Sequence, residues 1–120
     1  DAAIKTLEKA LRNDVHESRL LDNLGYYYLE KENYDKAIEK FNDCIKIGND
    51  IDSIDAILGI SLVYFYKNDK KHAKTYLDLA KQIKPVLNKG MEGLLELEQV
   101  GYFYSEKKKG TLKRMFEELK

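Results

Sequence analysis

The sequence predicts an all-α protein built from antiparallel helical hairpins in tandem, and three observations predict it. Charged and apolar residues alternate with helical spacing almost throughout the 120 residues. Proline occurs once, at Pro85, and no Gly/Ser/Pro-rich linker interrupts the pattern. A block of about 35 residues also returns along the chain with its large and small side chains in the same places, as in repeat proteins.

The repeat is clearest between the segments that begin at Leu21 and Ile57. In the first helix of the block, three large residues and one small one return 36 positions later: Leu21, Leu24, Gly25 and Tyr28 become Ile57, Ile60, Ser61 and Tyr64. In the second helix of the block, Ala37, Phe41 and Cys44 correspond 36 positions later to Ala73, Leu77 and Ala80. The same three positions correspond 34 residues earlier to Ala3, Leu7 and Ala10. Small residues let paired helices approach closely, and the large ones fill the space between them.

A looser copy follows towards the C-terminus. GYFYSEKKKGTLKRMF, from Gly101, is similar to GYYYLEKENYDKAIEKF, from Gly25. First-helix slots are filled by Leu97, Val100, Gly101 and Tyr104. Leu112 and Phe116 fill the second-helix slots only if the turn is one residue shorter, so this copy is degenerate.

The pattern resembles the tetratricopeptide repeat, whose signature is large-x2-large-small-x2-aromatic, then Ala-x3-large, then a proline. Pro85 stands where the proline is expected, and Asn49 replaces it one repeat earlier. The resemblance implies a right-handed superhelix of stacked hairpins, an α-solenoid. It divides a single domain, 1–120, into a half repeat that supplies only a second helix, two full repeats and a degenerate repeat with capping helices: 1–13, 18–51, 54–87 and 88–120.

The first elements expected are helices over 2–13, 17–31 and 35–47, which form the half repeat and the first hairpin. Asp14 followed by Glu17 is an acidic capping arrangement before the helix at 17–31. Asn33 can cap the helix at 35–47, since its side chain can accept a hydrogen bond from a free backbone N–H.

Helices over 53–67 and 70–83 form the second hairpin, with Asp52 and Asp55 as an acidic cap of the first and Asn68 as the cap of the second. The last helices are expected over 88–107 and 111–119, with Thr111 after Gly110 starting the final one. That final helix has one apolar stripe and a polar outer face, which suits the end of a repeat array; the stripe is Leu112, Met115, Phe116 and Leu119.

Charge and composition exclude several classes of protein. The chain has 21 Lys and Arg and 21 Asp and Glu, so its formal net charge is zero, which argues against a nucleic-acid binder. No apolar run approaches the roughly 18 residues of a transmembrane helix, so no membrane insertion is expected. Cys44 is the single cysteine, which excludes an internal disulfide and favours the cytoplasm, although a bacterial periplasm is also compatible.

No catalytic, cofactor or metal site is predicted, and we therefore expect the chain not to be an enzyme. The two histidines, His16 and His72, have no spacing to Cys44 that would suit a metal or a nucleophile with its base. Cys44 occupies a small-residue core slot, so a packed thiol is expected there. The acidic group of Asp52 and its neighbours lacks the glycine and distal glutamate of a calcium loop.

The resemblance also implies a binding surface, because the first helices of successive tetratricopeptide hairpins line a concave groove. Carried over position by position, the partner-binding residues are Arg19, Asp22, Asn23, Tyr26, Leu29, Glu30, Asp55, Leu58, Leu62, Phe65, Tyr66 and Tyr102. Three aromatic triplets fall in these helices, at 26–28, 64–66 and 102–104. One tyrosine of each triplet belongs to the core, at 28, 64 and 104, and the remaining rings that face the groove or the surface are Tyr26, Phe65, Tyr66 and Tyr102.

The groove differs from the best-known one in the family, which clamps a C-terminal carboxylate with lysines and asparagines. Here Asp22 and Tyr26 stand in the first two of those slots, and Asp22 would repel a carboxylate. A peptide with apolar anchors and some basic residues is therefore the expected ligand.

The function predicted from these features is a non-catalytic scaffold that binds a protein or peptide in its groove. Two alternatives stay open. The chain, which begins at Asp1, can be an accessory domain cut from a larger enzyme or signalling protein. It can also be a self-associating module, since the first helix carries an apolar stripe through which a homodimer could form: Ile4, Leu7 and Leu11.

Overall fold

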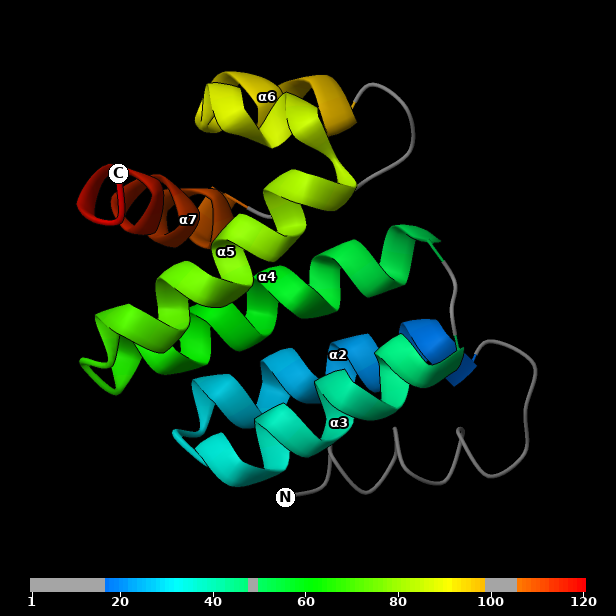
Figure 1. Ribbon diagram of the computed structural model, residues 1–120. Helices are drawn as coiled ribbons and strands as arrows, with labels where there is room; N and C mark the ends of the chain where they lie inside the picture. Colours follow the sequence, from blue (N-terminus) through cyan, green and yellow to red (C-terminus); the bar gives the residue numbers. More distant parts are fainter. Residues whose placement is uncertain (1–16, 48–49, 99–105) are drawn as a thin grey trace.

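The computed structural model describes residues 17–47, 50–98 and 106–120. These residues contain no strand and confirm the predicted all-α class. They form six α-helices and one 3-10 helix (Figure 1): α2 (Glu17–Glu30), α3 (Tyr34–Ile47), α4 (Asp50–Tyr66), α5 (Lys70–Ile83), η1 (Pro85–Lys89), α6 (Met91–Glu98) and α7 (Glu106–Glu118). None of these helices is both long and apolar enough to span a membrane.

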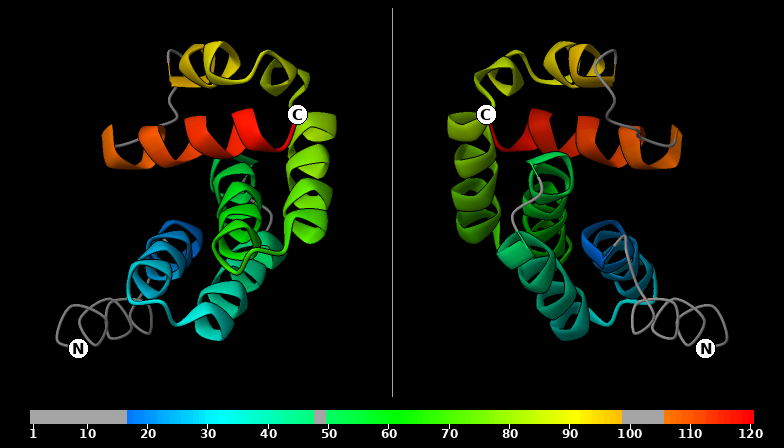
Figure 2. Two further views of the ribbon diagram at one scale, coloured as in Figure 1. Left: turned by 90° about the vertical axis from the view of Figure 1, so that its left-hand side faces the viewer. Right: turned by 90° about the vertical axis from the view of Figure 1, so that its right-hand side faces the viewer.

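Helices α2 to α5 form the two predicted hairpins. Helix α2 packs on α3 and α4 packs on α5, while α3 and α2 both contact α4 and so join one hairpin to the next. Figure 2 shows α2 and α4 on one side of the stack and α3 and α5 on the other. We call these sides the α2–α4 face and the α3–α5 face. The remaining helices, η1, α6 and α7, lie at the end of the stack beyond α4 and α5 (Figure 1).

Phe41 of α3 sets the spacing between the hairpins. Its side chain is fully buried. A Cβ atom added to Gly25 on α2 or to Gly59 on α4 would lie 2.4 Å from a carbon of the Phe41 ring, far inside van der Waals contact. The ring therefore needs both glycines, of which the repeat pattern indicated only Gly25.

A small residue has the same role within the second hairpin. Ser61 of α4 is fully buried, and its hydroxyl donates a hydrogen bond to the backbone carbonyl of Ala73 on α5 at 2.6 Å. Both residues were predicted as small slots. The bond satisfies a hydroxyl that would otherwise destabilise the core by about 1–3 kcal/mol.

The first helix of each hairpin ends in the same turn. Glu32 and Asn68 have positive φ angles of 60° and 61°. After each of them, a backbone N–H reaches back five residues: that of Asn33 donates to the carbonyl of Tyr28, and that of Asp69 to the carbonyl of Tyr64, both at 2.9 Å. This is the Schellman arrangement, in which a left-handed residue lets the helix satisfy its last carbonyls.

The predicted cap of α3 is confirmed and that of α5 is wrong. The Asn33 side chain accepts a hydrogen bond from the backbone N–H of Lys36 at 3.4 Å. At α5 the cap is Asp69, whose side chain accepts a hydrogen bond from the backbone N–H of His72 at 3.1 Å. This hydrogen bond lowers the pKa of Asp69. Asn68 instead supplies the left-handed turn conformation, which asparagine tolerates better than most residues.

The predicted boundaries near the C-terminus are also wrong. The segment expected as one helix over 88–107 begins with η1 and α6, and α7 already starts at Glu106 and continues through Gly110 and Thr111. A glycine inside a helix destabilises it by about 1 kcal/mol, whereas burying one large apolar side chain stabilises by about 1.5–3 kcal/mol. The apolar stripe of α7 is buried as predicted, and this burial outweighs the glycine: Leu112, Met115, Phe116 and Leu119.

Several predictions concern residues outside the described ranges. They are the helix over 2–13 with its apolar stripe, the cap at Asp14, and the rings of Tyr102 and Tyr104. The right-handed superhelix also stays a prediction.

Candidate functional site

The residues predicted to bind a partner occupy three kinds of position. Four are exposed on α2 and α4: Arg19, Asn23, Glu30 and Tyr66. Tyr26 is half-buried. The others that the structure describes are buried: Asp22, Leu29, Asp55, Leu58, Leu62 and Phe65. The buried apolar members belong to the hydrophobic core beneath the α2–α4 face: Leu29, Leu58, Leu62 and Phe65.

Phe65 was expected at the surface, and this prediction is wrong, because α7 lies against α4. The guanidinium carbon of Arg114 lies 5.1 Å from the centre of the Phe65 ring. Tyr66, the next residue, remains 40% exposed and donates a hydrogen bond to the hydroxyl of Thr111 at 3.3 Å. Figure 2 shows α7 crossing the end of α4, so part of the predicted lining of the groove is covered by the chain itself.

Three aspartates gather on the α2–α4 face and are almost completely buried. Asp22 on α2 and Asp52 and Asp55 on α4 are 5%, 7% and 9% exposed. The prediction that Asp52 and Asp55 cap α4 is wrong, because α4 begins at Asp50 and both residues lie inside it. Burying a carboxylate is unfavourable unless it is paired, so the partners of each aspartate matter.

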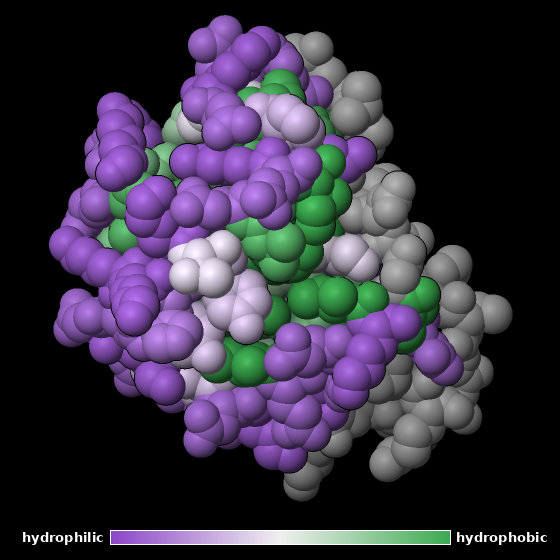
Figure 3. Space-filling model, viewed as in Figure 1, coloured by the Kyte–Doolittle hydropathy of each residue, from purple (hydrophilic) through white to green (hydrophobic). Residues whose placement is uncertain are grey.

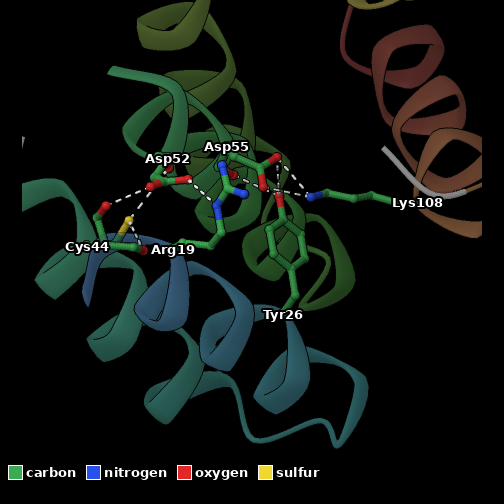
Figure 4. A network of polar contacts seen from close by, with 7 residues as sticks. Arg19, Tyr26, Cys44, Asp52, Asp55 and Lys108 are labelled. Carbon is green, nitrogen blue, oxygen red and sulfur yellow. Dashed lines mark hydrogen bonds and ion pairs between the residues drawn. The ribbon is translucent and has the colours of Figure 1, made fainter. Parts of the chain in front are cut away.

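Asp52 is held by residues of α2 (Figure 4). The hydroxyl of Ser18 donates to its carboxylate at 2.6 Å, and the Nε of Arg19 lies 3.9 Å from its other oxygen. The thiol of Cys44 donates to the backbone carbonyls of Ser18 and Asp52, at 3.2 and 3.6 Å. Burial, followed by the charges of the nearby aspartates, raises the pKa of this thiol, which agrees with the expected packed and unreactive cysteine.

Asp55 is paired with a lysine from the far end of the chain. The ammonium of Lys108 on α7 lies 2.8 Å from both carboxylate oxygens of Asp55 and 3.6 Å from the centre of the Tyr26 ring (Figure 4). The side chains of Lys108 and Asp55 are only 16% and 13% exposed. The hydroxyl of Tyr26 donates to the backbone carbonyl of Asp55 at 2.7 Å, which fixes the ring beneath the ammonium. We call Asp55 and Tyr26 together the ammonium site.

Asp22 lies beside this site and is incompletely satisfied. Its Oδ1 atom is buried and has no hydrogen-bond partner. Burial, followed by a hydrogen bond and the charge of Asp55, raises the pKa of Asp22 well above its ordinary value. The carboxyl therefore keeps its proton at pH values where an exposed aspartate is ionised.

The position of the Tyr26 ring depends on the hairpin interface. Its ring meets that of Phe41 edge to face, with 4.9 Å between their centres. Phe41 is itself fixed between Gly25 and Gly59. The ammonium site is thus built on the core contact that joins the two hairpins.

Sequence reasoning placed Asp22, Asp55 and Tyr26 in the binding set but missed Lys108. That lysine lies 53 positions from Asp55 and belongs to a run of lysines that is typical of a solvated turn. One signal was available, because acids at positions that face a helix interface need a cation nearby.

The described residues contain no group of three or more His, Cys, Asp or Glu side chains arranged to hold a metal ion. Asp52 contacts a hydroxyl and a guanidinium group, and Asp55 contacts an ammonium group. Carboxylates with such partners form charge-assisted hydrogen bonds, so the region suits the binding of polar side chains.

Comparison with protein-family models gives a match to the model described as tetratricopeptide repeat, over residues 18–50 and 54–86. The first range contains α2 and α3, and the second contains α4 and α5. Together they cover more than half of the chain. Comparisons with curated proteins and with solved structures gave no match.

Proposed function

Because the chain belongs to the tetratricopeptide repeat family, whose repeats generally mediate protein–protein interaction, we propose that it is a non-catalytic scaffold that binds a peptide or partner protein on its α2–α4 face. The observation that carries the proposal is the gathering of charged, amide and tyrosine side chains on this face, next to the ammonium site that Lys108 occupies. The same activity would serve an accessory domain of a larger protein.

The accessible members of the predicted set would make the contacts. Arg19, Asn23 and Glu30 are exposed along α2, and Tyr66 is exposed on α4. Tyrosine offers a large contact area with a polar end and few rotatable bonds, which favours it in interfaces. Helices that are ordered before binding lose little entropy when the ligand arrives.

The chemistry of the face favours a basic ligand with apolar anchors. Asp52 and Asp55 place two acidic side chains in one region of this face, and Glu30 is exposed on α2. Complementary charge increases the association rate and the specificity of such complexes. A peptide with a free carboxylate as its main recognition element would be disfavoured here.

A matched pair of asparagines tests the location of binding. Asn23 is exposed on α2, and Asn42 is exposed on α3, on the opposite face. We would measure binding of the chain to an array of basic amphipathic peptides and compare the Asn23→Arg and Asn42→Arg variants. We expect Asn23→Arg to weaken the binding of the peptides that the parent chain binds at least about tenfold, roughly 1.4 kcal/mol. Asn42→Arg should leave the affinity for these peptides unchanged.

The reverse result would move the binding surface to the other side of the molecule. Figure 3 shows the α3–α5 face as largely hydrophilic with a hydrophobic band across it. Large apolar side chains exposed on these two helices are Ile47, Leu79 and Ile83. Loss of binding in Asn42→Arg alone would point to that band and contradict the proposal.

A further inference from the structure

We propose that the ammonium site is a lysine-binding subsite, which takes the side chain of a lysine in the bound partner and is filled by Lys108 when no partner is present. The inference rests on the proposed function and narrows the ligand to a segment that carries a lysine. It also makes the chain its own competitor for this site.

The geometry suits a primary ammonium group. One nitrogen contacts both carboxylate oxygens of Asp55 at 2.8 Å and lies 3.6 Å above the Tyr26 ring. A compact ammonium can make these contacts from one atom, whereas a guanidinium spreads its donors over a plane. A cation above an aromatic ring is attracted by about 0.5–2 kcal/mol, depending on how far it is desolvated.

The site has more acceptor capacity than Lys108 uses. Lys108 satisfies the carboxylate of Asp55 but leaves Oδ1 of Asp22 without a hydrogen-bond partner, although this side chain is 5% exposed. Asp52 does not fill this role, because Ser18 and Arg19 hold it. A buried acceptor without a donor, next to a bound ammonium, indicates a site made for a cation that is placed slightly differently from that of Lys108.

Lys108 can leave the site without moving α7. It lies in the first turn of the helix, and the helix is held by its buried stripe further along: Leu112, Met115 and Phe116. In the proposed exchange this one long side chain rotates out of the site, while the buried stripe keeps α7 in place. A tethered group competes at an effective concentration in the millimolar range, so a partner needs further contacts on the α2–α4 face to displace it.

The test empties the site and offers it a free lysine side chain. In Lys108→Met, the apolar stem remains and the ammonium is lost. The matched control is Lys113→Met, an exposed lysine of the same helix. The probes are Nα-acetyl-lysine N-methylamide and its uncharged norleucine analogue, titrated at millimolar concentrations while the amide and ring signals of Tyr26 and Asp55 are followed by NMR.

In Lys108→Met, we expect the lysine probe to give saturable shifts of the Tyr26 and Asp55 signals, and the norleucine probe to give none. In Lys113→Met, which keeps Lys108 as a competitor, the lysine probe should bind at least tenfold more weakly. In the double variant Lys108→Met, Asp55→Asn, neither probe should give saturable shifts. Equal binding of the two probes, or retention of binding in the double variant, would overturn the proposal. Circular dichroism of each variant shows that it is folded.

A measurement on the unaltered chain keeps the inference testable if Lys108→Met does not fold. Peptides that bind the α2–α4 face in the array are resynthesised with each lysine replaced by norleucine. Replacement of one particular lysine should weaken binding to the parent chain at least tenfold. The same replacement should have no effect on binding to the Asp55→Asn variant. If binding is sensitive to Asn23→Arg but to no lysine replacement, the proposed function stands and the subsite is wrong. If no peptide is sensitive to Asn23→Arg, the proposed function fails, and the comparison of lysine with norleucine in the peptides that still bind, in the parent and in Asp55→Asn, decides the subsite.

Discussion

The buried carboxyl of Asp22 should make the fold less stable at neutral pH than at acidic pH. Its pKa is raised by burial and by Asp55, so the folded state keeps its proton at pH values where the unfolded state has lost it. Stability therefore falls as pH rises from the ordinary aspartate range, near 3.9, towards the raised value, by at most about 1.4 kcal/mol per pH unit. Below that range both states are protonated and the effect vanishes.

Asp22→Asn removes this titration and keeps an amide donor for Asp55. We expect the variant to be more stable than the parent by at least about 1 kcal/mol at pH 7, and the difference to shrink towards zero at pH 3. Urea unfolding at pH 3, 5 and 7 measures the difference, with Asp43→Asn on α3 as the control, since the Asp43 side chain is 41% exposed. A constant difference between variant and parent over this range would contradict the assignment.

At the scale of residues, the sequence predicted sizes better than charges. Phe41, Ala37 and Cys44 fill the core slots that the repeat assigned to them, because slot size follows from helical spacing. Asp52 and Asp55 were predicted as an acidic cap, since nothing local distinguishes a capping aspartate from one that meets a lysine of a distant helix. Pairing over 53 positions depends on tertiary packing.

At the scale of elements, two glycines within helices should respond in opposite directions to the same change. Alanine normally stabilises a helix by about 1 kcal/mol over glycine. At Gly110 on α7 an added Cβ would have no atom within 4 Å among the described residues, apart from its own helix backbone and chain neighbours, so Gly110→Ala should stabilise the protein by up to that amount. At Gly59 the added Cβ meets the Phe41 ring, and overpacking should destabilise by about 1–3 kcal/mol.

Thermal unfolding of both variants checks this prediction. The double variant Gly59→Ala, Phe41→Leu tests the cause, because the smaller leucine side chain leaves room for the added methyl group. Its loss of stability should therefore be smaller than the sum of the losses in the two single variants. If Gly59→Ala were as stable as Gly110→Ala, the ring would not set the distance between the hairpins.

Element boundaries show where local signals are sufficient. The turns after α2 and α4 and the start of α5 at Lys70 follow from Asn and Asp residues between apolar stripes. Gly110 misled the prediction, because a glycine indicates a helix end only when tertiary burial does not outweigh it. The apolar stripe of α7 decides that case, and its depth of burial was unknown from the sequence.

At the scale of the whole molecule, Cys44 should report the opening of the stack. Its thiol is fully buried and contacts backbone carbonyls of α2 and α4, through Ser18 and Asp52. A thiol reagent should therefore label it at least about a thousandfold more slowly than a free cysteine, since reaction requires unfolding of a stable core. The logarithm of the rate should rise with urea with the slope of global unfolding.

Labelling and circular dichroism measured on the same samples test this. Fast labelling that is independent of urea would mean that α2 or α4 opens locally. The raised pKa of Cys44 disfavours the thiolate in the folded state only, and the rates are compared at one pH with a model peptide, which represents the exposed thiol.

The arrangement of the whole chain was the least predictable level. The repeat pattern gave the two hairpins and their order, because stacking is the only way for each to bury its apolar side. It did not give the course of η1, α6 and α7, whose sequence departs from the pattern. The covering of Phe65 by Arg114, and the pairing of Lys108 with Asp55, depend on that course.

The matching turns at Glu32 and Asn68 have a consequence for chain engineering. The backbone leaves α2 and α4 in the same left-handed geometry, so the turn after Asn68 could lead into Asn33 as well as it leads into Asp69. A chain in which residues 33–68 are duplicated would pass from one copy to the next through a turn that the protein already contains. The number of hairpins could then be changed by joining segments at this turn, with no newly designed loop.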